Sequence, residues 1–226
     1  LLTETNKKIL IEGSFGFKAD VPVDHRLRNP LLGGGAILDV GCYPLSMSKL
    51  IAGHLQGAAF AEPQSISATG RFDETGVDLQ SDAHLIFSES IEAKISCAID
   101  EELSNQLVIS SGEVSITVPQ PWHCGQFQGG QSSITIVNES GLVEEILCDD
   151  QIGLFTREIE HASSCILDQK LESRFISHTD TQSNMFWLDQ WRQQLNIACP
   201  KNLIAHSPIL ESKAFLSQVP KLQNIA

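Results

Sequence analysis

Apolar and polar side chains alternate along one stretch of this chain, Ile91-Glu92-Ala93-Lys94-Ile95-Ser96-Cys97-Ala98-Ile99. A period of two is typical of a β-strand that buries one face and exposes the other. Cys97 falls in the apolar set, so we expect its thiol to be a small buried side chain. The stretch predicts a sheet that is covered on one side only.

Further strand candidates lie on both sides of this stretch. Its partner is expected at residues 82–88, joined to it through a short polar turn. Six other segments have strand character: 9–19, 64–72, 106–110, 113–118, 132–138 and 142–147. After residue 150 the apolar period becomes helical, first at Phe155, Ile159, Ala162 and Ile166, then at Met185, Leu188 and Leu195. This order predicts an α+β fold: an open, mainly antiparallel β-sheet with helices packed on one face.

Composition limits the class of protein. The chain has 226 residues, with 15 Lys and Arg against 28 Asp and Glu, so its formal net charge is −13. Such an acidic chain is not expected to bind nucleic acid or a membrane surface. We expect one domain over residues 1–197, with an irregular tail packed on it over residues 198–226. The scattered cysteines, which form no C-x-x-C pair, favour reduced thiols and a cytoplasmic location.

The densest cluster of candidate functional residues is Gly33-Gly34-Gly35-Ala36-Ile37-Leu38-Asp39-Val40-Gly41-Cys42-Tyr43-Pro44. We expect a helix over residues 36–52, ended by Gly53, with Asp39 and Tyr43 on one face because they are four residues apart. A carboxylate beside a phenol is suited to proton transfer. Pro44 strains the helix next to Tyr43, as is common at functional sites. The alternative is a kinked core helix with Asp39 on the surface.

The loop before this helix supplies candidate ligand contacts. Consecutive glycines let the backbone approach a ligand, and free amides at Gly34 and Gly35 would favour a cofactor phosphate. Arg26 is a candidate for binding a cofactor phosphate, and Arg28 for binding a substrate oxygen. The alternative for both arginines is a solvated basic loop.

No metal site is predicted from the sequence. The turn carboxylates Asp73, Glu74 and Asp78 do not have the spacing of a calcium loop, and we expect them to be solvated. Glu158 and His161 have the spacing of half a di-iron site, but the sequence has no second Glu-x-x-His.

The run from Gly33 to Pro44 resembles the signature of the C-terminal domain of the Gfo/Idh/MocA oxidoreductases. Within this family it is most similar to the branch of dimeric dihydrodiol dehydrogenase and glucose–fructose oxidoreductase. The segment Arg71–Asp78 resembles the family's entry into the central sheet. Glu158-Ile-Glu-His161, Cys165-Ile166 and Glu172-Ser173 resemble a late helix and the loop after it. The resemblance covers residues 8–197.

The resemblance implies the C-terminal part of a two-domain enzyme. An N-terminal Rossmann domain would bind NADP or NAD, and its Glu-Lys-Pro lysine would complete the active site. The tyrosine matching Tyr43 is the acid/base in this branch, and the aspartate matching Asp39 orients the substrate or tunes that tyrosine. An aromatic side chain at Trp122 would lie near the substrate, although packing on the sheet is the alternative. The open sheet would make a homodimer interface.

The glycine run itself is not a dinucleotide fingerprint, since Leu38 stands where the last glycine should be and no strand precedes it. The sequence also contains no Glu-Lys-Pro. We therefore expect the catalytic C-terminal part of an oxidoreductase acting on a sugar, a cyclic diol or a dicarbonyl, inactive without its Rossmann domain. The alternative is a non-catalytic binding or dimerisation module that keeps the fold.

Overall fold

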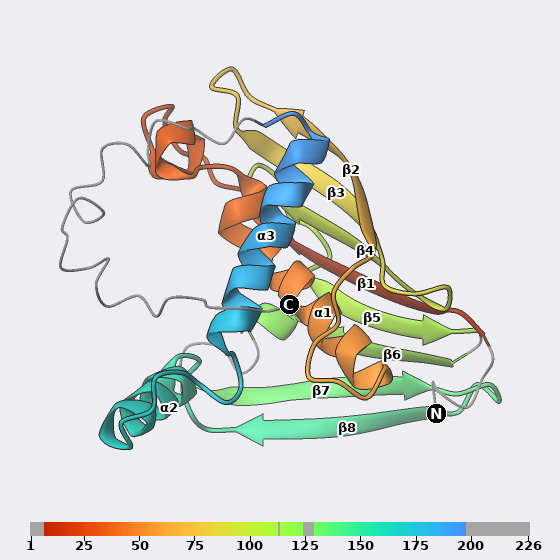
Figure 1. Ribbon diagram of the computed structural model, residues 1–226. Coiled ribbons are helices and arrows are strands. Elements are labelled where there is room, and N and C mark those ends of the chain that lie inside the picture. Colours follow the sequence, from red (N-terminus) through yellow and green to blue (C-terminus); the bar gives the residue numbers. More distant parts are fainter. Residues whose placement is uncertain (1–6, 113, 124–128, 198–226) are drawn as a thin grey trace, which may run out of the picture.

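One sheet organises the chain. The computed structural model describes residues 7–112, 114–123 and 129–197. Within these ranges eight strands lie in the order β2-β3-β4-β1-β5-β6-β7-β8 (Figure 1). Neighbouring strands are antiparallel except β1 and β4, which are parallel. The strands are β1 (Ile9–Gly16), β2 (Ser65–Phe72), β3 (Asp78–Ile86), β4 (Ile91–Ala98), β5 (Gln106–Ser111), β6 (Val114–Pro119), β7 (Gly130–Val137) and β8 (Val143–Asp150).

Helices cover one side of this sheet. They are α1 (Cys42–Leu55) and α3 (His178–Gln194), with a π-helix over Ile37–Gly41 directly before α1. A third helix, α2 (Thr156–Leu167), follows β8. Figure 1 shows α1 and α3 crossing the same face, where α1 contacts β1 and β4 and α3 contacts β2. The predicted α+β class and the open, mainly antiparallel sheet are confirmed.

The alternating stretch in β4 forms the centre of the core as predicted. Ile91, Ala93, Ile95 and Cys97 are each at most 5% exposed, whereas the side chains between them are not buried. The helices meet this face through Trp191, which is fully buried and donates from Nε1 to Ser81 Oγ at 2.8 Å. Burying a large apolar side chain stabilises the fold by about 1.5–3 kcal/mol, so this face holds the helical layer on the sheet.

The helix after the glycine loop differs from the prediction at both ends. Gly53 lies inside α1, and the helix ends two residues later, followed by Gly57 at a φ of +78°. A Cβ on Gly53 would come within 2.5 Å of the Phe60 backbone, so close packing rather than chain termination requires this glycine. Pro44 is the third residue of α1, so the wide π-helical turn lies directly before the residue that has no N–H to donate to the helix.

The predicted inner face of α2 is wrong. Phe155, Ile159 and Ile166 are 53%, 64% and 75% exposed, and Cys165 is the one described residue of α2 that is buried. Figure 1 shows the reason: α2 lies beyond the end of β7 and β8, away from the layer formed by α1 and α3.

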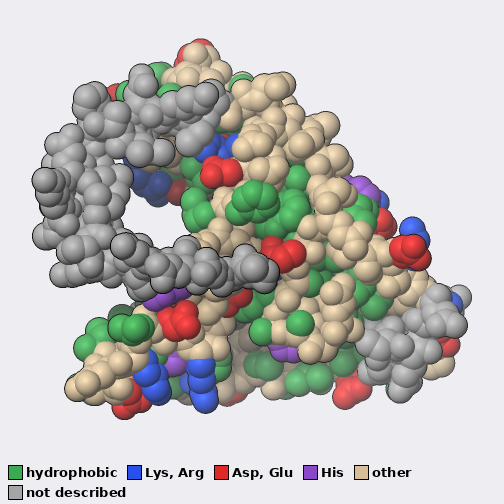
Figure 2. Space-filling model, in the orientation of Figure 1, with side chains coloured by type: hydrophobic (Ala, Val, Ile, Leu, Met, Phe, Trp, Pro, Cys, Tyr) green, Lys and Arg blue, Asp and Glu red, His purple; other side chains and the backbone are tan. Residues whose placement is uncertain are grey.

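Hydrophobic and charged side chains share the surface on the helix-bearing side (Figure 2). Of the predicted apolar stripe on α3, Leu188 is buried at 2% exposure, Leu195 is partly buried and Met185 is 48% exposed. The tail predicted over residues 198–226 lies outside the described residues. Within the described ranges, no helix combines the length and apolar character needed to cross a membrane.

Candidate functional site

Tyr43 stands at the start of α1 within a group of aromatic rings. Its ring meets Phe15 edge-on, with centroids 5.1 Å apart, and Trp122 at 6.0 Å. Phe15 and Trp122 stack on each other at 5.8 Å, and His123 meets Phe15 edge-on at 5.4 Å. Trp122 and Phe15 are each 7% exposed, but Tyr43 is 46% exposed. The rings therefore form a buried wall from which one phenol reaches solvent.

Trp122 owes its position to a hydrogen bond as well as to packing. Its Nε1 donates to the Ser14 carbonyl at 2.7 Å, which ties the turn after β6 to the end of β1. Trp122 therefore packs on the sheet, and its ring also contacts Tyr43, while its predicted position near the substrate stays a prediction.

Asp39 lies in the π-helix, one turn before Tyr43. Its Oδ1 accepts a hydrogen bond from Arg26 Nη1 at 2.7 Å, and its side chain is 17% exposed. The Arg26 side chain is 65% exposed, so the guanidinium pairs with Asp39 and still faces solvent. The predicted pair of Asp39 and Tyr43 thus acquires a third member, Arg26, from the loop.

The phenol of Tyr43 is a weak acid in this setting. Partial burial raises the pKa of Tyr43 above its ordinary value of 10.0. The acidic groups of Cys42, Asp39 and Glu158, in that order, raise the pKa of the phenol further. Tyr43 is therefore protonated at neutral pH and able to donate a proton, while a nearby cation would be needed for it to accept one.

The prediction of free amides in the glycine loop is wrong. Gly34 N–H donates to the Asn29 carbonyl at 3.0 Å, and Gly35 N–H donates to the Leu27 carbonyl at 2.9 Å. A Cβ on Gly34 would lie 2.7 Å from the Leu27 oxygen, so this glycine lets the loop fold on itself. Neither amide is left for a phosphate, and a cofactor contact at these glycines stays a prediction without geometric support.

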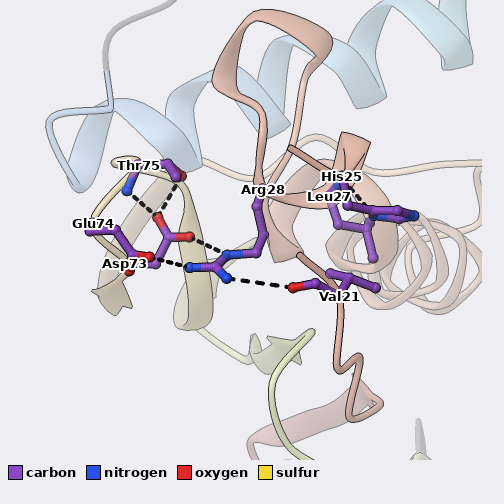
Figure 3. Close-up of polar contacts among 7 residues, drawn as sticks. All are labelled: Val21, His25, Leu27, Arg28, Asp73, Glu74 and Thr75. Atoms are coloured by element: carbon purple, nitrogen blue, oxygen red, sulfur yellow. Dashed lines mark hydrogen bonds and ion pairs between the residues drawn. The ribbon is translucent and has the colours of Figure 1, made fainter. Parts of the chain in front are cut away.

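Arg28 binds two carboxylates rather than standing in a solvated loop (Figure 3). Its Nε donates to Asp73 at 2.8 Å and its Nη2 to Glu74 at 2.7 Å. Asp73 also accepts from the backbone and hydroxyl of Thr75. The geometry favours a brace between the loop and the β2–β3 turn, so substrate binding by Arg28 stays an untested prediction.

The turn carboxylates are not all solvated, contrary to prediction. The side chain of Asp73 is 2% exposed, and Asp78 is 1% exposed. Burial raises the pKa of Asp78 from 3.8 to about 6. Asp78 accepts a hydrogen bond from Ile37 N–H at 2.6 Å, so an internal carboxylate occupies the helix start that the sequence suggested for a phosphate.

Sequence reasoning did not select Phe15, although it contacts every ring of the cluster. Phe15 sits in the alternating apolar set of β1, where nothing in the sequence distinguishes it from a core residue. The neighbouring glycines, Gly13 and Gly16, were the available signal. A Cβ on Gly13 would lie 3.2 Å from Pro44, so β1 and α1 approach closely beside Tyr43.

A family model matches the part of the chain that carries most of these residues. The description of the matching family model is "GFO/IDH/MocA C-terminal domain", and the match covers residues 7–116. Over this segment, the chain belongs to the GFO/IDH/MocA family. The match includes the glycine loop, the pair of Asp39 and Tyr43, and strands β1 to β5 of the sheet.

Relatives of this GFO/IDH/MocA domain are oxidoreductases. The chain is 28% identical over 172 residues to trans-1,2-dihydrobenzene-1,2-diol dehydrogenase of Xenopus tropicalis, a match that covers 75% of this chain and 49% of that protein. For the enzyme of the same name from Oryctolagus cuniculus, identity is 30% over 176 residues, covering 75% and 50%. The chain spans about half the length of these relatives.

Solved structures share the fold. A 3-ketoreductase from Actinomadura kijaniata, in complex with NADP and TDP-benzene, matches with a TM-score of 0.69 and 18% identity, covering 83% of this chain and 54% of that chain. An aldose-aldose oxidoreductase from Caulobacter crescentus matches with a TM-score of 0.63 and 19% identity, covering 84% and 52%. At these identities the likeness concerns the GFO/IDH/MocA domain fold alone.

Proposed function

We propose that this chain is the substrate-binding, acid/base-supplying part of an NAD(P)-dependent oxidoreductase that acts on a sugar, a cyclic diol or a dicarbonyl. One observation carries the proposal. Tyr43 presents a half-exposed phenol against a wall of aromatic rings, one helical turn after Asp39, whose charge helps to raise the pKa of the phenol. The ring-bearing substrates of this class have flat apolar faces that would lie against such a wall, with a hydroxyl or carbonyl oxygen at the phenol.

In this proposal Tyr43 holds the proton. In the reductive direction its Oη donates to the substrate carbonyl oxygen as the carbonyl carbon receives a hydride; in oxidation Oη takes the hydroxyl proton back. The raised pKa of Tyr43 keeps the proton on Oη at neutral pH but makes the phenol a weaker acid. Asp39, held by Arg26, orients the substrate hydroxyl beside the phenol. For the oxidative direction a cation supplied from outside the described residues would have to lower the pKa of Tyr43.

A nicotinamide, when bound, supplies or accepts the hydride. Of the three predicted cofactor contacts, Arg26 fits this role because its guanidinium is exposed and adjacent to the site. Gly34 and Gly35 do not fit, because both amides are used within the loop. We therefore propose that Arg26 faces the cofactor, while most of the cofactor contacts come from the half of the relatives that this chain does not match.

The alternative function is a non-catalytic module that binds or dimerises through the sheet. It would use a hollow of about 660 Å³ on the face of the sheet without helices, which is lined by polar side chains such as Glu12, Asp82 and Lys94. We propose that this face also forms the homodimer interface in the oxidoreductase, so the two functions share this feature.

Replacing Tyr43 by Phe separates the two functions. The Tyr43→Phe change keeps the ring against Phe15 and Trp122 and removes only the hydroxyl. The experiment uses the complete reading frame that contains this chain, assayed with NADP or NAD and with diol, aldose and dicarbonyl substrates. An oxidoreductase should lose turnover by about 10²-fold or more with an unchanged circular dichroism spectrum. Unchanged turnover, or no dinucleotide-dependent activity in the wild type, would favour the module.

A further inference from the structure

Asp78 is buried because β3 contains a bulge at its start. Arg71 pairs with Gln80 and Phe72 pairs with Asp78, so Leu79 is the extra residue. Further along β3 the buried positions have odd numbers, as at Ser81, and the even-numbered positions face the open side. Without the bulge Asp78 would follow the even-numbered set. The bulge therefore turns this carboxylate toward the helices, as bulges beside functional sites often do.

The carboxylate of Asp78 lies directly against the glycine loop. A Cβ on Gly35 would be 2.2 Å from Asp78 Oδ1, and Gly35 has a φ of +110°. Only glycine fits there, for both reasons. The other oxygen, Oδ2, accepts the Ile37 N–H at 2.6 Å. Two further titratable groups face Asp78: Arg192 on α3 and the Cys97 thiol on β4.

This contact connects Asp78 to Tyr43 through a short stretch of backbone. Ile37 is the first residue of the π-helix that carries Asp39 and continues into α1. The residue before it, Ala36, makes no side-chain hydrogen bond as a cap. An N-terminal cap satisfies orphan amides and fixes the direction in which a helix starts. Here the cap comes from a strand that is 41 residues away in sequence.

We propose that Asp78 is a positioning residue for Asp39 and Tyr43: its carboxylate, pressed on Gly35 and bonded to Ile37, fixes where the π-helix begins and hence where the phenol points. The catalytic consequence rests on the proposed function, but the positioning itself does not. Asp78 touches neither the phenol nor the predicted substrate side, so its effect is transmitted by the helix backbone.

The chain offers a direct readout, because Tyr43 is its only tyrosine. Tyrosinate absorbance near 295 nm therefore reports the titration of Tyr43 alone. We would compare the 226-residue chain with Asp78→Ala and Asp78→Asn, using a stopped-flow pH jump so that absorbance is read before any unfolding. The matched control is Leu85→Ala. Leu85 is a buried residue of the same strand, so this substitution destabilises the core without changing the contacts at the start of the helix.

Asp78→Ala should move the midpoint of the Tyr43 titration toward 10, because the released phenol gains solvent. Asp78→Asn, which keeps one acceptor oxygen, should move it less, and Leu85→Ala should leave it unchanged. If Asp78→Ala does not fold, the shift in Asp78→Asn decides. Wild-type midpoints in the Asp78 variants, or an equal shift in Leu85→Ala, would overturn the proposal.

The same readout separates this proposal from the proposed function. The titration needs neither cofactor nor substrate, so Asp78 can prove to position a tyrosine that does not catalyse. In that case Tyr43→Phe would leave turnover unchanged while the Asp78 variants still moved the midpoint. If Tyr43 is catalytic, Asp78→Ala should also lower kcat by about 10-fold to 100-fold with a smaller change in KM, since small displacements of a reacting group have effects of this size.

Discussion

Two side chains with opposite surroundings determine the chemistry at the start of α1. Tyr43 is partly exposed and surrounded by acidic groups that keep its phenol protonated. Asp78 is buried, and its pKa is raised to about 6, so its carboxylate is mostly ionised at neutral pH and able to hold the helix start. The exposed group is the one available to substrate, while the buried one acts on the backbone. Each of these roles can be tested without substrate.

Asp39→Asn should lower the pKa of Tyr43, because the Asp39 charge is one of the groups that raise it. The wild-type chain should titrate above 10 at 295 nm, and Asp39→Asn should titrate closer to 10. Asp82→Asn, which removes a carboxylate from the open face of β3, is the matched control and should change nothing. A wild-type midpoint below 10 would contradict the environment described for Tyr43.

The buried carboxylate predicts an unusual dependence of stability on pH. Because the folded-state pKa of Asp78 is raised from 3.8 to about 6, the folded chain binds more protons than the unfolded chain between these values. The contribution of Asp78 to stability is fully present below its unfolded pKa and is lost as pH rises through about 6. Relative to Asp78→Asn, the wild type should lose about 2 kcal/mol between pH 4 and 7.

Urea unfolding at several pH values measures this difference directly, and subtracting the variant removes the contributions of all other groups. Arg192 on α3 stabilises the ionised form, which limits the size of the effect. A difference that stays constant from pH 4 to 7 would show that Asp78 titrates at an ordinary value in the folded chain.

At the scale of elements, the strands could be predicted because their signal is local. Period-two alternation in β4 follows from burial of one face, and each predicted strand appears within a few residues of its expected bounds. The bulge before Gln80 could not be predicted, since it depends on how β2 pairs with β3. For the same reason the burial of Asp78, and with it the cap of the π-helix, had no sequence signal.

The helices show the limit of periodicity more clearly. Ile159 and Ile166 do lie on one face of α2, but whether that face is covered depends on where the helix sits, and it sits beyond the sheet.

At the candidate site, Asp39 and Tyr43 could be predicted from spacing and resemblance, and Trp122 from resemblance. Phe15 and the pairing of Arg26 with Asp39 required the three-dimensional contact.

A polar cluster fastens α1 to α3 and gives a prediction at this scale. Lys49, whose side chain is 2% exposed, lies 3.6 Å from Glu62 and donates to Ser183. Ser183 and Trp187 donate in turn to Glu62 at 2.6–2.7 Å. Burial lowers the pKa of Lys49, and Glu62 partly restores it. The acidic side chains of Glu62 and, less strongly, Asp180 therefore favour the charged form of this buried lysine.

Glu62→Ala should destabilise the chain by about 1–2 kcal/mol, because it leaves the Trp187 N–H without its acceptor and the Lys49 ammonium without the carboxylate paired with it. The value lies below that for a fully buried pair because the side chain of Glu62 is 57% exposed. Lys49→Met combined with Glu62→Ala should recover part of the loss. Urea unfolding of the four forms of this double-mutant cycle gives the coupling, and a single variant as stable as the wild type would contradict it.

At the scale of the molecule, helices cover only one of the two faces of the sheet within the described residues. Helices α1 and α3 cover one face (Figure 1), while strands β1 to β5 line a hollow of about 660 Å³ on the other. Glu12 and Lys94 are paired in register there, and Ser96 donates to Asp82 at 2.6 Å. A polar, hollowed sheet face of this size is able to accept a second copy with hydrogen bonds and ion pairs across a two-fold axis.

We expect the chain to sediment as a homodimer of about twice its 24.7 kDa mass, and Ser96→Arg to convert it to a monomer by filling the centre of the hollow. Ser164→Arg, on the exposed side of α2, is the matched control and should leave the dimer intact.

Because each copy carries a net charge of −13, the two copies repel each other, and raising the salt concentration should tighten the dimer by screening that repulsion. Sedimentation velocity at low and high salt tests both effects. A wild-type chain that stays monomeric at about 100 µM in high salt would mean that the open face does not bind a second copy with the area that stable dimers bury, about 800 Å² per partner.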